Sequence, residues 1–500
     1  MSFLPVIALL IGVWLLFAAA VRPKAVLYAA VFFLPWRGLS PHFFLGVSLS
    51  RILIVILAIA TIFRFTRIRD IGRVPMSRAM LVYILYAVTL SLARIPFLPE
   101  VGVFGGALRG PVNRALLQII YFLAVLVTPL IVCPIYLKTT RDCAYLCKSF
   151  FISLIILAGL GWVQLGVWYT TGFDLFPVGL VPGFFGYFPP VRPGFVMAGL
   201  DIHRMCSLGG EPKDLGQGLV VGLLVVQAIL AVGLASPDER KLRWCWLFFF
   251  FSMLMTYSTS SIFLWAVGSG LEIVILLFRP VIMGGLSRLI RNARTLIVAA
   301  ALIACVIVSY SGISFDKVRR VAEGRSVDRA ELEEFDEATL AFLEHDPDWT
   351  IFGTGMGNVH LYANAFLSPD AATYANQTVF RPKTGLLRMA AEIGIIGILF
   401  WLVSVFDQTR YLLKYRPLAP RRGGYPVLSR IAPTLFIVVL TLAGCQFAVD
   451  SIEEYVFASL ALSLATISII SELNRNLDVN SVRAVAMDMW PVPRRRHLSV

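Results

Sequence analysis

The sequence of 500 residues is 58% hydrophobic and only 15% charged, with a mean hydropathy of +0.79. A water-soluble domain of this length needs far more charge to cover its surface, so the composition excludes a soluble globular protein. The formal net charge of +14 is not a sign of nucleic-acid binding, because the Lys and Arg residues fall mainly in short loops beside apolar runs. Basic residues in such loops orient a membrane protein. The composition therefore predicts a protein embedded in a lipid bilayer, without a nucleic-acid partner.

Apolar runs of about 20 residues, the length that crosses a bilayer as a helix, follow one another almost from end to end. Strands of a membrane barrel are shorter and alternate in polarity, so these runs favour helices. We therefore predict an all-α, polytopic transmembrane bundle of about thirteen spans. The expected spans are 3–21, 25–36, 49–63, 79–93, 115–133, 149–169, 215–235, 244–257, 261–278, 295–311, 385–406, 431–449 and 452–471.

Basic residues predict the orientation, since short cytoplasmic loops are enriched in Lys and Arg. Six connectors agree on one alternation: 64–78, 138–148, 240–243, 279–294, 410–430 and the tail at 494–496. This alternation predicts a cytoplasmic C-terminus and two long loops on the external face. The second loop, 312–384, has twelve acidic and seven basic residues, which suits the outer side. We expect a multi-pass protein of the inner, or cytoplasmic, membrane.

The chain thus divides into membrane and loop segments. The expected units are N-terminal transmembrane helices (1–169), external loop 1 (170–214), further transmembrane helices (215–311), a large external loop (312–384), C-terminal transmembrane helices (385–471) and a cytoplasmic tail (472–500). Within the large loop, 328–345 is predicted as an amphipathic helix, because Leu332, Phe335, Phe342 and Leu343 share one face. That helix either caps the bundle or forms a lid over a glycan-binding cleft.

The first external loop ends in RMCSLGGEPKDLGQG (204–218) and runs directly into an apolar helix. Arg204, Glu211, Lys213 and Asp214 are therefore expected at the membrane surface. A guanidinium group there can donate two parallel hydrogen bonds to pyrophosphate oxygens. The alternative is a structural Arg204 that pairs with Glu211 or extends toward the lipid headgroups.

The second loop contains IFGTGMGN (351–358) and ends in FRPKTGLLRMAAEIGIIGILFW (380–401). The glycine-rich segment follows no predicted strand of a βαβ unit, which argues against a nucleotide-binding loop. Glu392 lies about two turns inside the following helix, where an unpaired carboxylate is costly. Arg388, one turn earlier, is its expected i,i+4 partner.

The order of these parts resembles the O-antigen polymerase and ligase superfamily. That family has an R-x-x-(S/G)-L-x-G-x-P segment leading into a helix, a large external loop, a G-x-G element and E-x-G-x-x-G in the next helix. The matching residues lie at 204–212, 353–357 and 392–397, and the specific resemblance covers roughly 170–406. The rest of the chain matches as a hydropathy profile only.

Two departures from the family pattern bear on the activity. Ligases of the family usually carry a His just before the E-x-G helix, and this chain reads VFRPKTGLLRM there, without a His. The absence favours a polymerase over a ligase. Many members have Ser-Arg after the short external turn, where this chain has Ser260, Ser261 and Ile262, so no role of that Arg carries over.

The resemblance implies that the protein joins undecaprenyl-pyrophosphate-linked oligosaccharide repeat units at the external face. A sugar hydroxyl of one unit attacks the anomeric carbon of another, and polyprenyl pyrophosphate leaves. Fixed cations can stabilise that leaving group without a metal or other cofactor. Since the His and Cys residues are scattered, we expect a metal-independent glycosyltransferase with no metal site.

The expected catalytic residues are Arg204, Arg381, Glu211 and Glu392, and the expected substrate-binding residues are Arg192, Lys213, His360, Lys383 and Arg388. Arg204 and Arg381 are the first choices for pyrophosphate contacts. A base for the acceptor hydroxyl would be a carboxylate or His, and the sequence leaves Glu211, His360, Glu392 and the turn with Asp450, Glu453 and Glu454 open. That turn is interpreted first as a solvated connection between two helices.

Other function classes remain as alternatives. A ligase-type glycan transferase keeps the same chemistry with another acceptor. A lipid-linked glycan flippase or other transporter would explain the many spans and the intramembrane Glu272, but it explains the long external loops poorly. The expected partners are the lipid-linked glycan, the bilayer and, as a further protein, a chain-length regulator or a flippase.

Overall fold

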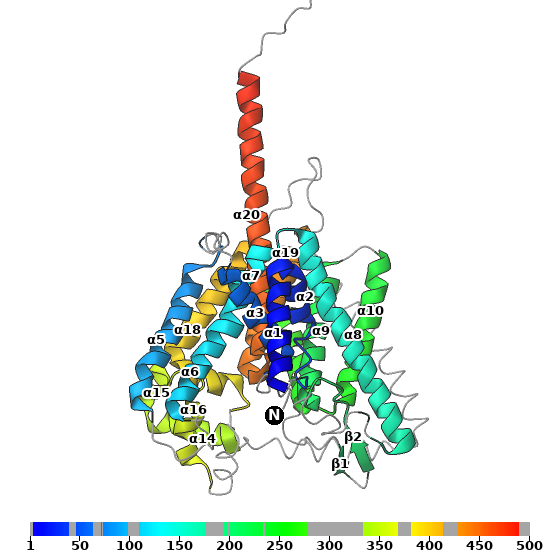
Figure 1. Ribbon diagram of the computed structural model, residues 1–500, viewed down its shortest axis with the longest axis vertical. Helices are drawn as coiled ribbons and strands as arrows, with labels where there is room; N and C mark the ends of the chain where they lie inside the picture. The colour runs from blue at the N-terminus through cyan, green and yellow to red at the C-terminus, as the bar shows by residue number, and fades with distance from the viewer. Residues whose placement is uncertain are drawn as a thin grey trace, which may run out of the picture.

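A computed structural model of the protein describes residues 4–39, 47–63, 72, 74–98, 110–173, 175, 194–197, 200–233, 236–278, 334–368, 382–413 and 428–489. The first half, shown in blue to cyan in Figure 1, comprises α1 (Leu4–Val21), α2 (Pro23–Phe32), α3 (Leu49–Phe63), α5 (Arg78–Arg94), η2 (Ile95–Phe97), α6 (Pro111–Tyr121), η4 (Phe122–Val127), α7 (Thr128–Tyr136) and α8 (Thr140–Thr171). A hairpin of β1 (Gly194–Met197) and β2 (Leu200–His203) and the helices α9 (Pro212–Val232), α10 (Ser236–Met255) and α11 (Thr259–Phe278) follow.

The C-terminal part begins with short helices and ends with long ones. It comprises α14 (Glu334–His345), α15 (Pro347–Phe352), α16 (Val359–Ala363), η5 (Asn364–Phe366), α18 (Gly385–Leu413), α19 (Leu428–Ala448), η7 (Asp450–Ile452) and α20 (Glu453–Met489). The described regular secondary structure is therefore helical apart from one antiparallel hairpin, in which Gly194 pairs with His203 and Met197 with Leu200. The predicted helical membrane bundle is confirmed, and the hairpin is an addition that the sequence did not indicate.

Local sequence sets the ends of the elements, and α8 illustrates how. Thr139 begins the helix, since its hydroxyl accepts from the Asp142 backbone N–H at 3.1 Å, and the Asp142 carboxylate accepts from the Thr139 N–H at 3.0 Å. This reciprocal capping box satisfies donors that the first turn leaves free. Gly172 ends the helix in the left-handed region, with φ 71°, where a residue without Cβ is favoured.

Eight helices in the described part of the chain are long and apolar enough to cross a membrane. They coincide with eight predicted spans, and the predicted boundary between α10 and α11 is confirmed, because α10 ends at Met255 and α11 begins at Thr259. The count of about thirteen is not confirmed. The helices α1 and α2 form one pair bent by 119°, and α3 is a shorter apolar helix. The predicted span 295–311 lies outside the described residues.

The core of the bundle lies between α9, α18, α19 and α20. Trp401 of α18, fully buried, stacks on Phe457 of α20 with ring centroids 5.4 Å apart. Phe122 meets the same Phe457 edge-on at 6.2 Å. The membrane window of α9 is 83% buried, more than that of any other candidate span among the described residues. Helices α18 and α20 are thereby fixed against each other, which matters for the side chains at their ends.

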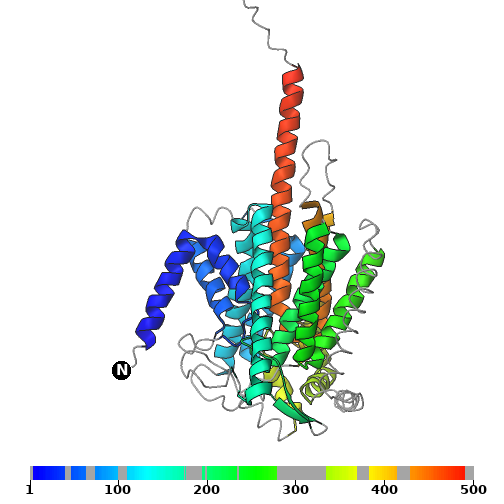
Figure 2. The ribbon, with the colours of Figure 1, turned by 90° about the vertical axis from the view of Figure 1, so that its right-hand side faces the viewer.

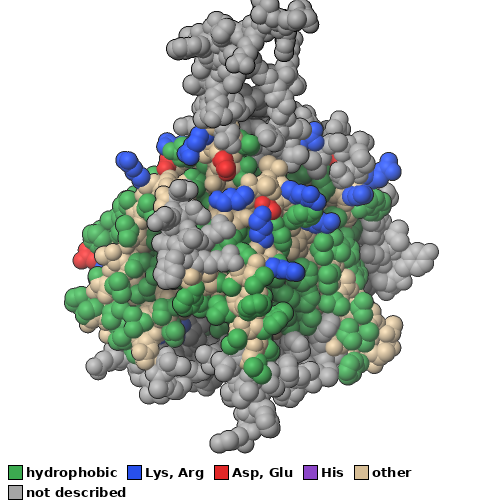
Figure 3. All heavy atoms as spheres, turned by 45° about the horizontal axis from the view of Figure 1, so that its top comes forward, with side chains coloured by type: hydrophobic (Ala, Val, Ile, Leu, Met, Phe, Trp, Pro, Cys, Tyr) green, Lys and Arg blue, Asp and Glu red, His purple; other side chains and the backbone are tan. Residues whose placement is uncertain are grey.

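The two ends of the bundle differ. We call the end with the β1–β2 hairpin and α14–α16 the loop end, and it holds the described parts of both predicted external loops (Figure 1). The opposite, basic end includes Lys148 and the pair of Lys24 and Asp142, with Nζ to Oδ2 at 2.9 Å. Lys and Arg side chains gather there above a band of hydrophobic ones (Figure 3). Helix α20 extends beyond the bundle at the basic end, while α1 stands out to one side (Figure 2).

Candidate functional site

The turn between α19 and α20, residues Asp450–Glu454, is the centre of a network of buried charges; we call it the acidic turn. It comprises η7 and the first two residues of α20. Arginines from three distant segments reach it: Arg388 from α18, Arg51 from α3 and Arg37 from the connection after α2. The interpretation of this segment as a solvated turn is wrong. Glu454 is only 7% exposed, and the carboxylates of Asp450, Glu453 and Glu454 all pair with arginines.

Arg388 makes the densest set of contacts. Its guanidinium Nε donates to Glu392 Oε1 at 3.0 Å, which confirms the predicted i,i+4 pair. Its Nη1 donates to Asp450 and, at 3.5 Å, to Glu453 Oε2. Arg388 is 6% and Glu392 4% exposed. One buried cation thus holds three carboxylates from α18 and the acidic turn, an arrangement in which each charge depends on its partners.

Arg51 and Glu454 form a second buried pair. The Arg51 Nε and Nη2 atoms lie 2.8 and 2.6 Å from Glu454 Oε1, and the Tyr121 hydroxyl donates to the same oxygen at 2.8 Å. The Arg51 guanidinium also lies over the Tyr121 ring, 4.9 Å from its centroid. These contacts fix the start of α20 against α3 and α6.

Arg37 connects the acidic turn to the segment resembling R-x-x-(S/G)-L-x-G-x-P. Its Nη1 donates to Asp214 Oδ1 at 3.0 Å, and its Nη2 donates to the backbone carbonyl of Ser451. Burial by itself would lower the pKa of Arg37, but the neighbouring Asp214, Tyr455 and Glu454 outweigh it and raise the pKa. The Arg37 guanidinium therefore stays charged.

The connection after α2 also packs closely, backbone against backbone, on the segment 204–218. A Cβ added to Gly38 would lie 2.7 Å from the Gly210 backbone nitrogen, so only glycine fits there. On the other side, the Ser451 hydroxyl donates to Gln217 Oε1 of α9 at 2.6 Å. The segment 204–218 is thereby joined to the acidic turn, through Asp214 with Arg37 and through Gln217 with Ser451.

Arg204 follows β2 in a segment that is pinned to α8 and α10. Gln164 Oε1 accepts from the Ser207 N–H at 2.8 Å, and the Met205 N–H donates to the Met255 carbonyl at 3.0 Å. Partial burial lowers the pKa of the Arg204 guanidinium, and the charge of Glu211 partly offsets this. Glu211 itself pairs with Lys213 at 2.9 Å, with 40% and 47% of the two side chains exposed.

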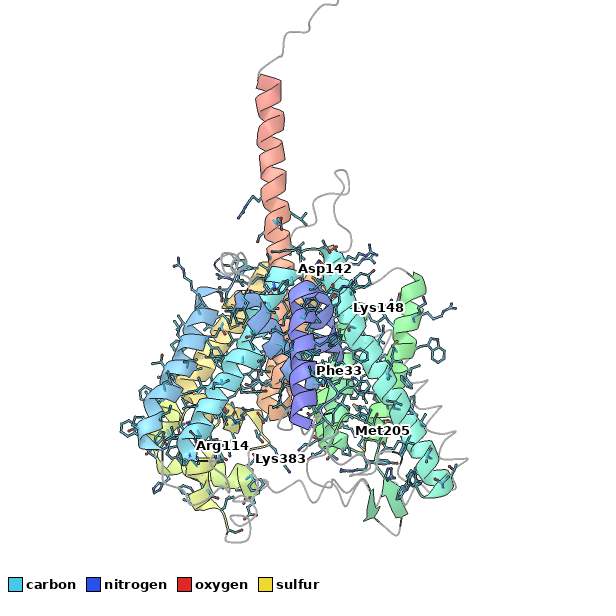
Figure 4. The ribbon with its side chains drawn as sticks, in the orientation of Figure 1. Phe33, Arg114, Asp142, Lys148, Met205 and Lys383 are labelled. Atoms are coloured by element: carbon cyan, nitrogen blue, oxygen red, sulfur yellow. The ribbon has the colours of Figure 1, made fainter. Side chains whose placement is uncertain are left out.

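The start of α18 brings Lys383 to the acidic turn. The Asp450 N–H donates to the Lys383 carbonyl at 3.3 Å, while the Lys383 side chain is exposed at the loop end (Figure 4). Asp336 of α14 caps α18 from outside, because its carboxylate accepts from the Lys383 N–H at 2.8 Å and from the Thr384 hydroxyl at 2.8 Å. Phe342 and Leu343 of α14 pack with Ala391 of α18. These contacts favour the cap over the lid for the predicted amphipathic helix, of which 328–333 lies outside the described residues.

The G-x-G element packs directly against the helix that carries Glu392. The Gly355 N–H donates to the Glu392 carbonyl at 2.9 Å, and the Thr354 N–H donates to the Ala391 carbonyl at 2.8 Å. These carbonyls are free because α18 kinks at Gly394, whose φ of 68° and ψ of 177° are not helical. A Cβ on Gly353 would lie 2.5 Å from the Glu392 carbonyl oxygen. Two motifs about 40 residues apart are thus one local structure.

The remaining predicted site residues have separate places. Arg192 and Arg381 lie outside the described residues, so the expected convergence of Arg204 and Arg381 stays a prediction. His360 is 3% exposed in α16. Within the described part of the chain, no group of three or more His, Cys, Asp or Glu side chains could hold a metal ion.

Three residues of the network were not expected: Arg37, Arg51 and Tyr121. The predicted orientation contains a signal for Arg37, since it places the connector between the spans 25–36 and 49–63 on the external side. A basic residue there runs against the usual cytoplasmic bias. Such an exception indicates an Arg with a specific partner.

Comparison with known proteins adds no identification. No protein-family model matches the chain, and no curated protein is significantly similar to it in sequence. The functional interpretation therefore depends on the geometry of the acidic turn and on the motif resemblance.

Proposed function

We propose that the protein is a glycan polymerase that joins undecaprenyl-pyrophosphate-linked oligosaccharide repeat units at the external face of the inner membrane. The observation that carries this proposal is the meeting of two motif segments at one turn. Asp214, just after the Arg204 motif, is bound through Arg37 to Ser451, and Glu392 is bound through Arg388 to Asp450 and Glu453. Sequence segments far apart thus build one charged site near the loop end.

The reaction needs little beyond positioning and charge. A hydroxyl oxygen of the acceptor sugar forms a bond to the anomeric carbon of the donor, and the bond from that carbon to the pyrophosphate oxygen breaks. The hydroxyl proton passes to a carboxylate, and undecaprenyl pyrophosphate leaves with the bonding electron pair. Preorganised cations stabilise the charge that develops on the leaving group.

The accessible cations are suited to the leaving pyrophosphate. Lys383 is exposed, Lys213 has a half-exposed side chain, and Arg204 is partly buried. Arg381, two residues before Lys383, is expected to act with them. Arg388, by contrast, is engaged with three carboxylates, so we assign it the role of a positioning residue.

The acidic turn supplies the candidate base. Asp450 and Glu453 have side chains 17% and 12% exposed, against 5% for Glu392. Both are held by Arg388, whose contacts fix the orientation of the two carboxylates. We assign the base to Asp450, the more exposed of the two, whose backbone is also tied to Lys383.

The test is conversion of a purified lipid-linked repeat unit by the purified full-length protein in lipid nanodiscs. The expected result is a ladder of lipid-linked polymers with an unchanged rate in EDTA. An activity that chelation abolishes and a divalent ion restores would contradict the metal-independent mechanism. No polymer from a verified substrate, with the protein folded and substrate bound, would contradict the proposed function.

Glu272 favours a second candidate, a lipid-linked glycan flippase. It lies inside the span α11 and is 1% exposed, and intramembrane carboxyl groups often serve transport. Surface glycan analysis in a deletion strain distinguishes the two functions. Single repeat units on the surface indicate a lost polymerase, whereas complete loss of the glycan indicates a lost flippase.

A further inference from the structure

A groove runs along the membrane-facing side of the bundle between α5 and α18. Its volume is about 430 Å³, and it is lined by Val82, Leu85, Tyr86, Thr89, Leu90, Ala93 and Phe400. Leu85 is 64% exposed and Val82 45%, so the groove opens outward. Only Thr89 and the Tyr86 hydroxyl are polar, so the lining suits a hydrocarbon chain.

A cation marks one end of this groove. Arg94 follows the lining residue Ala93 by one position and ends α5. Its guanidinium lies over the Trp349 ring, 4.1 Å from the centroid, and its Nε donates to the Gly353 carbonyl at 3.2 Å. Trp next to Arg at the end of an apolar helix is typical of the level of the lipid headgroups.

The apolar surface around Arg94 supports this level. Phe97 of η2 is 68% exposed, and Ile351 and Phe352 of α15 are 41% and 46% exposed. Side chains of this kind at the loop end are suited to contact with lipid at the membrane boundary. A lipid chain in the groove would therefore bring its headgroup to Arg94.

The groove is also joined to the charged site. The Tyr86 hydroxyl lies 3.0 Å from the Phe352 carbonyl oxygen and 3.1 Å from the Ile393 carbonyl oxygen. Ile393 follows Glu392 directly, and Gly353, which binds Arg94, packs against the Glu392 backbone. The groove thus shares its wall with the kinked helix of the candidate site.

We infer that this groove holds the isoprene units nearest the headgroup of the acceptor's undecaprenyl chain, with the acceptor's pyrophosphate at Arg94. The inference rests on the proposed function, because polymerisation joins two lipid-linked substrates and so needs two lipid sites. The acceptor's pyrophosphate stays intact, so one cation that holds it is sufficient. The donor's pyrophosphate gains charge as it leaves, which matches the several cations near the acidic turn.

One groove between two helices fits a lipid with one chain. A polyprenyl pyrophosphate has a single chain, whereas a phospholipid has two. The link through Tyr86 and Gly353 to the Glu392 helix places the bound lipid beside the reaction site. Both features favour the acceptor substrate over a surrounding phospholipid.

The test is the number of undecaprenyl pyrophosphate molecules bound per protein, measured by native mass spectrometry of the full chain. We expect two for the wild type and one for Thr89→Trp, which fills the groove. Leu92→Trp is the matched control, since Leu92 is 48% exposed on the same helix but does not line the groove, and it should still bind two. Thermal unfolding of each variant verifies folding.

Arg94 provides an independent variant. Arg94→Gln should lower occupancy of the second site at least tenfold, and Arg94→Lys should retain most of it because the charge remains. If Arg94 only stabilised the fold, by stacking on Trp349 and binding Gly353, both variants would lose occupancy of the second site to the same extent.

The outcomes separate the inference from the proposed function. Two molecules bound to Thr89→Trp, one bound to the wild type, or equal loss in Arg94→Gln and Arg94→Lys would overturn the groove assignment. So would phosphatidylglycerol that competes equally for the groove. No undecaprenyl pyrophosphate bound to the folded wild type would overturn the proposed function itself.

Discussion

Glu392 and Glu272 are both buried carboxyl groups in membrane-spanning helices, but their surroundings differ. Glu392 in α18 is 4% exposed and pairs with Arg388, which also binds Asp450 and Glu453. Glu272 in α11 is 1% exposed, and its Oε1 atom has no hydrogen-bond partner within the described part of the chain. The first environment gives buried carboxyl groups a charged partner, while the second does not.

The difference indicates where anionic substrates can be handled. Around the acidic turn, arginines from α3, α18 and the connection after α2 fix the carboxylates, and the exposed Lys383 joins the turn through its backbone. Glu272 forms no ion pair among the described residues, and Ser269, three residues earlier on α11, accepts from Gln227 at 3.3 Å. The proposed chemistry on a pyrophosphate requires the first environment. Substitutions can test whether the two environments differ.

The largest effect is expected from Arg388→Ala, which leaves the carboxylates around Arg388 without that charged partner, as Glu272 is. Three carboxylates lose their cation, and leaving buried charge unpaired costs about 3–5 kcal/mol. The free energy of unfolding of the purified protein should fall by that amount, and Arg388→Lys should lose less. Wild-type stability in Arg388→Ala would show that the carboxylates have other partners.

The next effect concerns activity rather than stability. Lys383→Ala and Arg204→Ala remove accessible cations, so each should raise the polymerisation barrier by about 2–4 kcal/mol while protein abundance stays normal. Lysine at 204 should rescue partly, since an ammonium group keeps the charge but loses the planar fork. Arg410→Ala is the matched control, because Arg410 is 48% exposed and pairs with Asp407 in another part of α18. Wild-type rates in both test variants would remove these residues from the mechanism.

Local features of this chain could be predicted from the sequence. The limits of α3 match the predicted span 49–63, and its last residue, Phe63, directly precedes a basic residue in the sequence. The Arg388–Glu392 pair could also be predicted, since helix geometry alone brings residues four apart together.

Long-range features could not be predicted in the same way. The turn with Asp450, Glu453 and Glu454 has a sequence typical of a solvated connection, and only the packing of α3, α6 and α18 around it makes it buried. Arg51 and Glu454 are 403 positions apart, and no local pattern relates them. The docking of Gly355 on Glu392 required the kink at Gly394, which a helical hydropathy pattern does not reveal.

Glu454→Gln should have a moderate effect. The amide oxygen can still accept from Arg51 and Tyr121, but Arg51 loses its charged partner, so unfolding should require about 1–3 kcal/mol less free energy. Tyr121→Phe removes one hydrogen bond to the same oxygen and should cost about 0.5–1.5 kcal/mol. Chemical unfolding of both variants measures the two values. A larger loss for Tyr121→Phe would contradict the assignment of the Arg51–Glu454 pair as the main contact.

The smallest effect is expected from Glu272→Gln. Glu272 has no ion-pair partner among the described residues and glutamine has nearly the same shape, so the free energy of unfolding should change by less than about 1 kcal/mol. The polymerisation rate should stay the same. Glu392→Gln is the matched comparison, because the same change there removes a charge that Arg388 binds and should reduce both stability and activity. A flippase that uses Glu272 would behave in the opposite way: Glu272→Gln would abolish transport of lipid-linked glycan in proteoliposomes, although the protein stays folded. Equal effects of the two substitutions would show that the two carboxyl groups have equivalent surroundings, which would contradict the difference between the acidic turn and the interior of α11.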